Sequence, residues 1–339
     1  SRVDGLEARF NDYEAGSFSS TTSASFSVDM AIGAVDGNAN TEKVVAAYGY
    51  QIDLSTSFTG EDALSVSLDA GAGAGALGEL DLNSAGDTLR VDGITYSFPL
   101  GEKTTVLVGD STDGSALYST ACVYGGFTNT LDDCGNYSSA FTSPDNGATL
   151  SASYDIGNGF TGALGYAGEG TSDGLMTKAG TDMFGGQLSY AADTYGVSVT
   201  YANIEDAANS YGTGTGTPEY LNETSYWGLN AYWTPDSTGS VPSISAGYES
   251  GDVEGSDTTD TTQWFVGLQW DEVGPGTFGV AAGSKGATVE NTDELLAYEA
   301  FYSYPVNDGM TITPAVFIME NATGTDDETG IVVKTSFSF

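Results

Sequence analysis

The sequence predicts an all-β fold: a transmembrane antiparallel β-barrel of about 16 strands, with one long loop folded inward to form a constriction. Three observations favour this fold. Apolar and small polar side chains alternate in many runs of about ten residues. The connections between these runs are short and long in turn. One segment of roughly 36 residues, 111–146, interrupts the pattern without any sustained alternation, and a loop of that length in a compact domain is usually functional.

The composition of the 339-residue chain excludes several classes of function. Its 47 acidic residues stand against 8 basic ones, a formal net charge of -39 that repels nucleic acid, so no nucleic-acid partner is expected. The absence of histidine removes histidine-based triads and histidine-ligated metals, and two cysteines are too few for a four-thiolate zinc site. We therefore expect that the chain is not an enzyme and that it has neither a cofactor nor a metal centre. No run approaches 18 consecutive apolar residues, which excludes a transmembrane helix.

The N-terminal 16 residues form the one helical-looking segment. Val3, Leu6 and Phe10 recur at spacings of three and four residues, which favours a short exposed helix. We expect residues 1–16 to be a helical or linker segment outside the barrel and residues 17–339 to form the barrel itself. From Thr22 the period changes to two, and strands are expected near 22–32, 43–54, 62–70, 87–99, 103–110, 147–156, 159–168, 183–192, 195–205, 223–234, 241–250, 260–271, 275–284, 293–305, 308–319 and 328–339.

The connections predict how the strands are joined. Short Gly-, Asp- and Asn-containing turns such as TGED, GNG and VNDG follow the even-numbered strands, whereas longer polar segments follow the odd-numbered ones. A barrel with short turns at one end and long loops at the other requires this order, and it places both chain ends at the short-turn end.

The two faces of the strands differ in polarity. On the strand expected at 223–234, Trp227, Leu229 and Trp233 share one face and Asn230 lies on the other. Trp264 and Trp270 flank the apolar face of the strand at 260–271 in the same way. A tryptophan near both ends of an apolar face is typical of the two aromatic girdles of a membrane barrel. A β-sandwich that buries these residues is the alternative, but about 16 strands without large apolar residues on the second face disfavour it.

The same parity assigns charged side chains to the interior. Asp29, Asp53, Glu299 and Lys334 fall on the face opposite the apolar one, so they should line the lumen.

Both ends of the chain carry a resemblance. The C-terminal GIVVKTSFSF ends on Phe339 and resembles the last strand of Gram-negative outer-membrane porins, which barrel-assembly machinery recognises. The N-terminal VDGLEARFNDYEAGSFSSTT resembles the junction of cyanobacterial porins, the carbohydrate-selective-porin-like barrels, where a surface-layer-homology region leads into the first strand. The sequence starts at Ser1 without such a region, which was either removed or never part of this chain, so the resemblance does not extend to peptidoglycan anchoring.

The resemblance implies a location and partners. We expect a barrel in the cell outer membrane with both termini periplasmic, in contact with membrane lipid and lipopolysaccharide and assembled as a homotrimer. In porins the third external loop, between strands five and six, forms the constriction, and segment 111–146 occupies that position. Cys122 and Cys134, the only cysteines, lie inside it, and their isolation as a pair in an oxidising compartment favours a disulfide.

The function implied is a water-filled channel for passive diffusion of inorganic ions and small hydrophilic solutes. We hypothesise that it is cation-selective, with acids of the loop facing bases of the wall. The loop acids are Asp113, Asp132, Asp133 and Asp145, and the wall bases are Lys43, Arg90, Lys334 and, at the start of the fifth strand, Lys103. The alternative is that these bases only pair with neighbouring barrel acids such as Asp92.

Two other functions remain open from the sequence. A saccharide-selective porin could use loop aromatics as a sugar slide, unless these rings pack against the wall: Tyr118, Tyr124, Phe127, Tyr137 and Phe141. A non-conducting structural or adhesive surface barrel could bind divalent cations at acidic loops such as DVEGSDTTD and TGTDDETG. Neither loop has the spacing of an EF-hand, which favours ordinary solvated loops.

Overall fold

The computed structural model of the chain describes residues 21–37, 40–73, 75–83, 86–132, 134–135, 147–168, 174–177, 181–206, 222–236, 239–253, 260–322 and 325–339. Segment 1–16, for which the sequence predicts a helix, lies outside these ranges. Within them, no helix has the length and the apolar character needed to cross a membrane.

The described residues form sixteen long strands, two strands of two residues and one short 3-10 helix. The long strands are β1 (Thr22–Gly37), β3 (Val45–Thr56), β4 (Ala63–Gly71), β5 (Arg90–Pro99), β6 (Thr104–Asp110), β7 (Ala148–Gly157), β8 (Phe160–Gly168), β9 (Asp182–Ala191), β10 (Tyr195–Asp206), β11 (Asn222–Trp233), β12 (Ser243–Val253), β13 (Thr261–Val273), β14 (Gly276–Ser284), β16 (Leu296–Asn307), β17 (Met310–Met319) and β18 (Glu328–Ser338). The short elements are β2 (Asn40–Thr41), η1 (Gly75–Leu80) and β15 (Thr288–Val289). The expected strands are therefore confirmed, each within a few residues.

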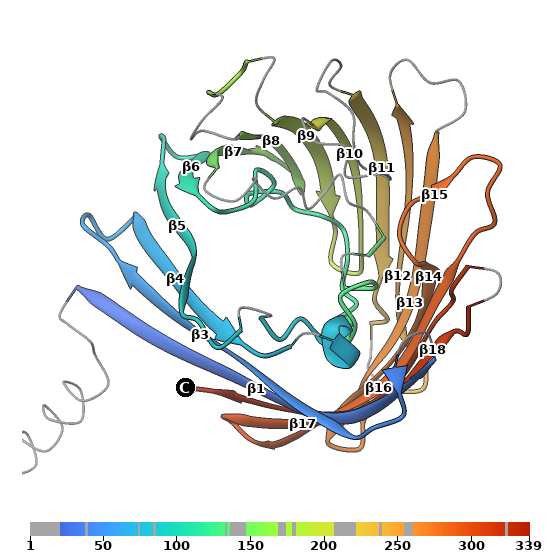
Figure 1. The fold of residues 1–339 in the computed structure, drawn as a ribbon. Coiled ribbons are helices and arrows are strands. Elements are labelled where there is room, and N and C mark those ends of the chain that lie inside the picture. Colours follow the sequence, from blue (N-terminus) through green and yellow to red (C-terminus); the bar gives the residue numbers. More distant parts are fainter. Residues whose placement is uncertain are drawn as a thin grey trace, which may run out of the picture.

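The strands close into one antiparallel barrel (Figure 1). Each long strand pairs with the next in sequence, and β1 pairs with β18 in a continuous antiparallel register from Ser27 with Ser338 to Asp36 with Thr329. The chain end completes this seam, because the amides of Phe26 and Phe339 each donate to the other's carbonyl oxygen, at 2.9 and 3.0 Å. Closure leaves no unpaired sheet edge, which is what a strand-built membrane span requires.

The side chains divide between two faces as the sequence predicts. On β11, Trp227, Leu229 and Trp233 are 60%, 49% and 41% exposed on the outside, whereas Asn230 is 0% exposed on the inside. Aromatic rings gather at both ends of the outer face. Near the short turns Trp270 contacts Phe278 with ring centroids 5.7 Å apart, and near the long loops Tyr201 contacts Trp227 at 5.0 Å. The outside is thus an apolar band between aromatic rings. The inside carries the polar positions, together with apolar residues such as Phe265, Phe301 and Phe317.

Candidate functional site

The segment between β6 and β7 folds into the barrel, and we call residues 111–147 the constriction loop. The amide of Ser111 donates to the carbonyl oxygen of Gly147 at 3.1 Å, which closes the base of the loop. From there the loop runs along the inside of the barrel (Figure 1). Its backbone amides donate to side chains of three wall strands. These pairs are Ala121 with Ser198 of β10 (2.9 Å), Val123 and Tyr124 with Ser245 of β12 (3.0 and 3.1 Å), and Gly125 with Gln269 of β13 (3.0 Å).

Glu299 of β16 is the strongest anchor of the constriction loop. Its side chain is only 4% exposed and accepts four hydrogen bonds from the loop. The donors are the Tyr124 hydroxyl (2.8 Å), the Phe127 amide (2.9 Å), the Thr128 amide (2.8 Å) and the Thr128 hydroxyl (2.6 Å). Burial, and then the adjacent carboxylate, raise the pKa of Tyr124, so its hydroxyl stays a donor. A buried carboxylate with all its acceptor sites used holds the loop in one position.

The aromatic rings of the constriction loop pack against the wall. Tyr124 and Phe127 are each 5% exposed. Their ring centroids lie 6.0 and 6.2 Å from that of Phe301, and Tyr124 is also 5.4 Å from Phe265. The ring faces of Tyr124 and Phe127 are therefore not available to a passing sugar, whereas Tyr137 and Phe141 lie outside the described residues.

Glycines of the inner wall make room for the loop. A Cβ added to Gly247 of β12 would lie 1.9 Å from the carbonyl oxygen of Cys134, and one added to Gly267 of β13 would lie 2.6 Å from the Tyr124 ring. A glycine inside a strand commonly marks such a close backbone approach. The inward glycines in the middle of these strands were therefore a readable sequence signal for where the loop docks.

A disulfide joins the two limbs of the constriction loop, as predicted. Cys122 and Cys134 are bonded and lie 12 residues apart in sequence. Cys122 follows the anchor at Ala121, and the carbonyl oxygen of Cys134 accepts from the side-chain amide of Asn230 on β11 at 3.1 Å. The bridge thus connects two parts of the loop that are each fixed to the wall.

A second inward loop meets the first, and the sequence did not lead us to expect it. We call residues 72–89, between β4 and β5, the η1 loop. Its Glu79 bonds the tip of the constriction loop: the Glu79 carbonyl oxygen accepts from the Asn129 amide at 2.8 Å, and its carboxylate accepts from the Thr130 hydroxyl at 2.8 Å. Leu82 lies over glycines of β3 and β4, Gly49 and Gly71. Both loops share one apolar cluster with the inner wall, which contains Leu77, Leu80, Leu82, Tyr124, Phe127, Leu131, Phe265, Phe301 and Phe317.

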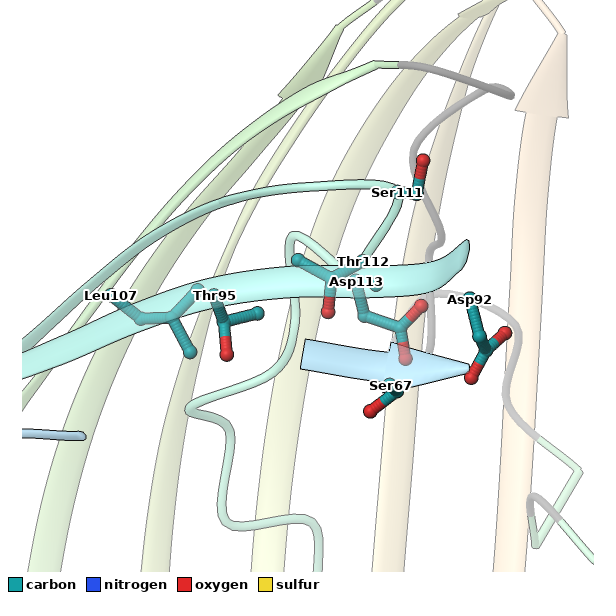
Figure 2. Close-up of a pocket in the computed structure, with 8 residues that line it drawn as sticks. Ser67, Asp92, Thr95, Leu107, Ser111, Thr112 and Asp113 are labelled. Carbon is teal, nitrogen blue, oxygen red and sulfur yellow. The ribbon is translucent and has the colours of Figure 1, made fainter. Parts of the chain in front are cut away.

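A cavity of about 500 Å³ remains at the neck of the constriction loop. Figure 2 shows its two carboxylates, Asp92 of β5 and Asp113 of the loop, directed toward the same space. The remaining lining residues are Ser67, Gly93, Thr95, Leu107, Ser111 and Thr112. Most of these residues are polar, and the carboxylates make the cavity negatively charged.

Two of the four predicted loop acids lie in the part of the chain that the structure describes. Asp113 lines the cavity, and Asp132 is an exposed residue of the described part of the loop. Asp133 and Asp145 lie outside the described residues. Of the four acids expected at the constriction, Asp113 is the one that lines the cavity.

The predicted bases have different surroundings in the structure. Lys334 forms an ion pair with Asp29, with Nζ and Oδ2 3.9 Å apart, and its Nζ lies 5.4 Å from the Phe127 ring centroid. Arg90 begins β5 opposite Asp69 of β4 and is exposed. Lys43 precedes β3 at the long-loop end. Lys103 lies in the turn before β6, at the opposite end of that strand from the loop, so the structure does not bring it to the others.

The interior parity is confirmed for the four charged residues expected in the lumen. Asp29 and Lys334 meet under the constriction loop, and Glu299 holds the loop. Asp53 accepts from the hydroxyl of Ser67, a cavity residue, at 2.6 Å. In the ranges that the structure covers, no group of three or more His, Cys, Asp or Glu side chains could hold a metal ion.

Comparison with known proteins shows the fold. No protein-family model matches the chain. An uncharacterised protein of Nostoc sp., alr4550, is 27% identical over 408 residues, which span 100% of this chain and 69% of that protein.

Three solved structures have the same barrel at low sequence identity. Pseudomonas putida OprB has a TM-score of 0.66 at 13% identity, over 94% of each chain. An anion-selective porin from Comamonas acidovorans has a TM-score of 0.64 at 14% identity, over 94% of this chain and 99% of that one. A loop-deletion mutant of OmpT, an outer-membrane protein of Vibrio cholerae, has a TM-score of 0.61 at 12% identity, over 94% and 100%. The chain therefore has the fold of bacterial outer-membrane porins.

Proposed function

We propose that the chain forms a channel in the outer membrane through which ions and small hydrophilic solutes diffuse passively, with a preference for cations. The observation that carries this proposal is the closed barrel with two loops packed inside it and an acidic cavity beside them. An apolar outer band with aromatic ends fits a bilayer, and a polar interior fits water and ions. The Nostoc relative is in keeping with the resemblance to cyanobacterial porins.

The sign of the selectivity has to come from this chain's own residues. One of the similar barrels is described as anion-selective, so the fold alone does not set the sign. Here 47 acids stand against 8 bases, and Lys334 is occupied by Asp29 and Phe127. In this proposal the acids at the constriction are Asp113, Asp132, Asp133 and Asp145, and we assign Lys43 and Arg90 as countercharges on the wall.

The assembly and surroundings are part of the same proposal. We place the barrel among membrane lipid and lipopolysaccharide as a homotrimer, with both termini in the periplasm and divalent cations bound only loosely at the acidic outer loops. A non-conducting adhesive barrel is the competing function, and the open acidic cavity favours the channel over it. The buried rings of Tyr124 and Phe127 favour ions over sugars as the preferred solutes.

Planar-bilayer recording tests the proposal. We expect the purified protein to insert as a steadily open channel whose reversal potential in a potassium chloride gradient reports a preference for potassium. A barrel that assembles but carries no current would overturn the channel. A reversal potential of the opposite sign would leave the channel in place and overturn the cation preference.

A further inference from the structure

The short helix η1 (Gly75–Leu80) has little stability of its own. It has six residues, two of which are glycines, and its backbone is kinked at Leu77, where φ is -106° and ψ is 19°. A 3-10 segment of this kind is shaped mainly by what it packs against. Leu77 and Leu80 are buried and belong to the apolar cluster that the constriction loop shares. The position of η1 therefore depends on its contacts inside the barrel.

Two left-handed backbone positions bound η1. Gly75 has a φ of 75° and Asp81 a φ of 48°. Glycine adopts this conformation freely, whereas a residue with a side chain is held in it by its surroundings, and such positions are common in switch regions. Leu82, directly after Asp81, is buried over Gly49 and Gly71. The helix thus has a hinge at Gly75 and a fixed point at Leu82.

One side of η1 faces the lumen. The helix is the short blue-green coil inside the barrel in Figure 1, and it lies against the wall strands β1 and β3. On its other side Gly75 and Gly78 are exposed. A Cβ added to Gly75 would meet no atom of the described residues within 4 Å, and one added to Gly78 would meet the carbonyl oxygen of Gly73 at 3.9 Å. Because the wall lies behind it, a displaced η1 moves into the lumen.

Glu79 joins η1 to the tip of the constriction loop. Its carboxylate accepts from the Thr130 hydroxyl at 2.8 Å, and its carbonyl oxygen accepts from the Asn129 amide at 2.8 Å. The tip is fixed independently of η1, because Glu299 on the wall accepts four hydrogen bonds from the constriction loop. The tip is therefore the fixed partner, and η1 is the element that Glu79 holds in place.

We propose that η1 is a gate of the channel and that Glu79 keeps this gate open, by latching η1 to the constriction loop through Thr130. When the latch breaks, η1 turns about Gly75 into the lumen and obstructs it. Gating elements are drawn from the least stable parts of a fold, and η1 is held only by such contacts. The proposal rests on the proposed function, since a gate needs a conducting channel. It makes Glu79 a positioning residue that acts through a hydrogen bond and not through its charge.

Single-channel recording tests the latch with variants of both partners. Glu79→Ala removes the acceptor, and Thr130→Val removes the donor while keeping the shape of the side chain. Losing a part-buried hydrogen bond to a carboxylate should raise the fraction of time spent in lower-conductance states about tenfold in each variant. The double variant should show no further rise, because both changes break the same bond. The fully open conductance should equal that of wild type.

Conservative variants separate the hydrogen bond from the charge. Glu79→Gln keeps an acceptor for the Thr130 hydroxyl, and Thr130→Ser keeps the hydroxyl, so both should recover most of the open time that Glu79→Ala and Thr130→Val lose. The matched control is Glu102→Ala, which removes a carboxylate from an exposed turn at the short-turn end and should gate as wild type does.

The outcomes distinguish the gate from the channel beneath it. Closures in Glu79→Ala that are no more frequent than in wild type, or additive effects in the double variant, overturn the latch. Equal closure in Glu79→Gln and Glu79→Ala also overturns it, since the charge would then be the cause. An open conductance above that of wild type in Glu79→Ala would show η1 leaving the lumen and contradict the gate. If Glu79→Ala fails to assemble, Thr130→Val decides by the same measurement. Wild type without conductance defeats the proposed function itself.

Discussion

At the scale of single residues, the interior is organised by carboxylates with opposite tasks. Glu299 is buried and fully hydrogen-bonded to the constriction loop, whereas Asp92 and Asp113 face open space and bind no described side chain. Glu299 holds the constriction loop in place, whereas the charges of Asp92 and Asp113 remain available to a solute. Sequence parity placed Glu299 in the lumen correctly, but parity gives only the face of a strand, and which task a carboxylate has depends on the loop above it.

Glu299→Gln should loosen the constriction loop without preventing the barrel from forming. The amide nitrogen of the new side chain is a donor and would face donors from Tyr124, Phe127 or Thr128. Hydrogen bonds to a charged group are worth about 1.5 to 3 kcal/mol each, so anchoring should weaken by about 3 kcal/mol. We expect larger fluctuations of the open-channel current and faster proteolysis within the loop. Glu290→Gln, at an exposed residue, is the control, and wild-type current noise in Glu299→Gln would contradict the anchoring role.

Asp62 gives the barrel a defined dependence on pH. It ends the connection between β3 and β4, and its carboxylate accepts five hydrogen bonds, from Ser57, Phe58, Thr59 (twice) and Tyr96. These donors, the Thr59 amide first, hold the pKa of Asp62 well below its usual range. A depressed pKa stabilises the folded state above the unfolded value of about 4, and this stabilisation is lost as the pH falls through the folded value.

Asp62→Asn should therefore lower the thermal unfolding temperature at neutral pH, with a difference from wild type that shrinks as the pH is lowered below about 4. Gel mobility of heated and unheated samples measures this transition for a barrel. Glu61→Gln, at the exposed neighbour, should follow wild type at every pH. If the difference in unfolding temperature between Asp62→Asn and wild type grew as the pH was lowered, the predicted direction of the pH dependence would be wrong.

At the scale of elements, the strands were predictable and the second inward loop was not. Alternation reports which face each residue occupies, so it fixed the run of residues in every long strand, and loop length singled out the segment after β6. The η1 loop, AGAGALGELDLNSAGDTL, has the small and polar composition of an external connection. Its inward course depends on Leu82 fitting over Gly49 and Gly71, a contact between residues far apart in sequence. The β-bulge at Asp92, where Ser67 pairs with Gly93 and Leu68 pairs with Val91, was not predicted either. A shift of one residue in strand pairing leaves no periodic pattern in the sequence.

Gly247→Ala should push the return limb of the constriction loop into the lumen. The added methyl would lie 1.9 Å from the carbonyl oxygen of Cys134 and 2.9 Å from the Asn230 side-chain nitrogen, so the bond between them must break. We expect an assembled barrel with a lower single-channel conductance, since the limb gives way more easily than a paired strand. Gly162→Ala on β8 is the control, because its nearest atom, Ile156 Cδ1, is at 3.6 Å. Equal conductance in the two variants would show that β12 does not position the loop.

At the scale of the whole molecule, charge and apolar surface are segregated around one closed sheet. Although the formal net charge is -39, the outer band carries almost no charged side chains. Exposed Leu, Val, Ile and aromatic side chains occupy the outward positions of the long strands. The acids gather in the loops, in the turns and inside. A chain this acidic can stand in a bilayer only if strand register keeps every charge off the lipid face, because a slip of one residue exchanges the two faces.

Leu229→Arg tests that segregation. Leu229 lies on the outer face of β11 between Trp227 and Trp233 and is 49% exposed, so an arginine there meets lipid near mid-membrane and costs about 2 to 4 kcal/mol. We expect a clear loss of assembled barrel in lipid vesicles. Asn230 is unsuitable as the inward control, because it is buried under the loop and donates to Cys134. Ser153→Arg on β7, inward by its pairing with Ala163 and only half-buried, should assemble as wild type does. Equal assembly of both arginine variants would mean that the outer face of β11 does not contact lipid, as it would not if that strand lay in a subunit interface.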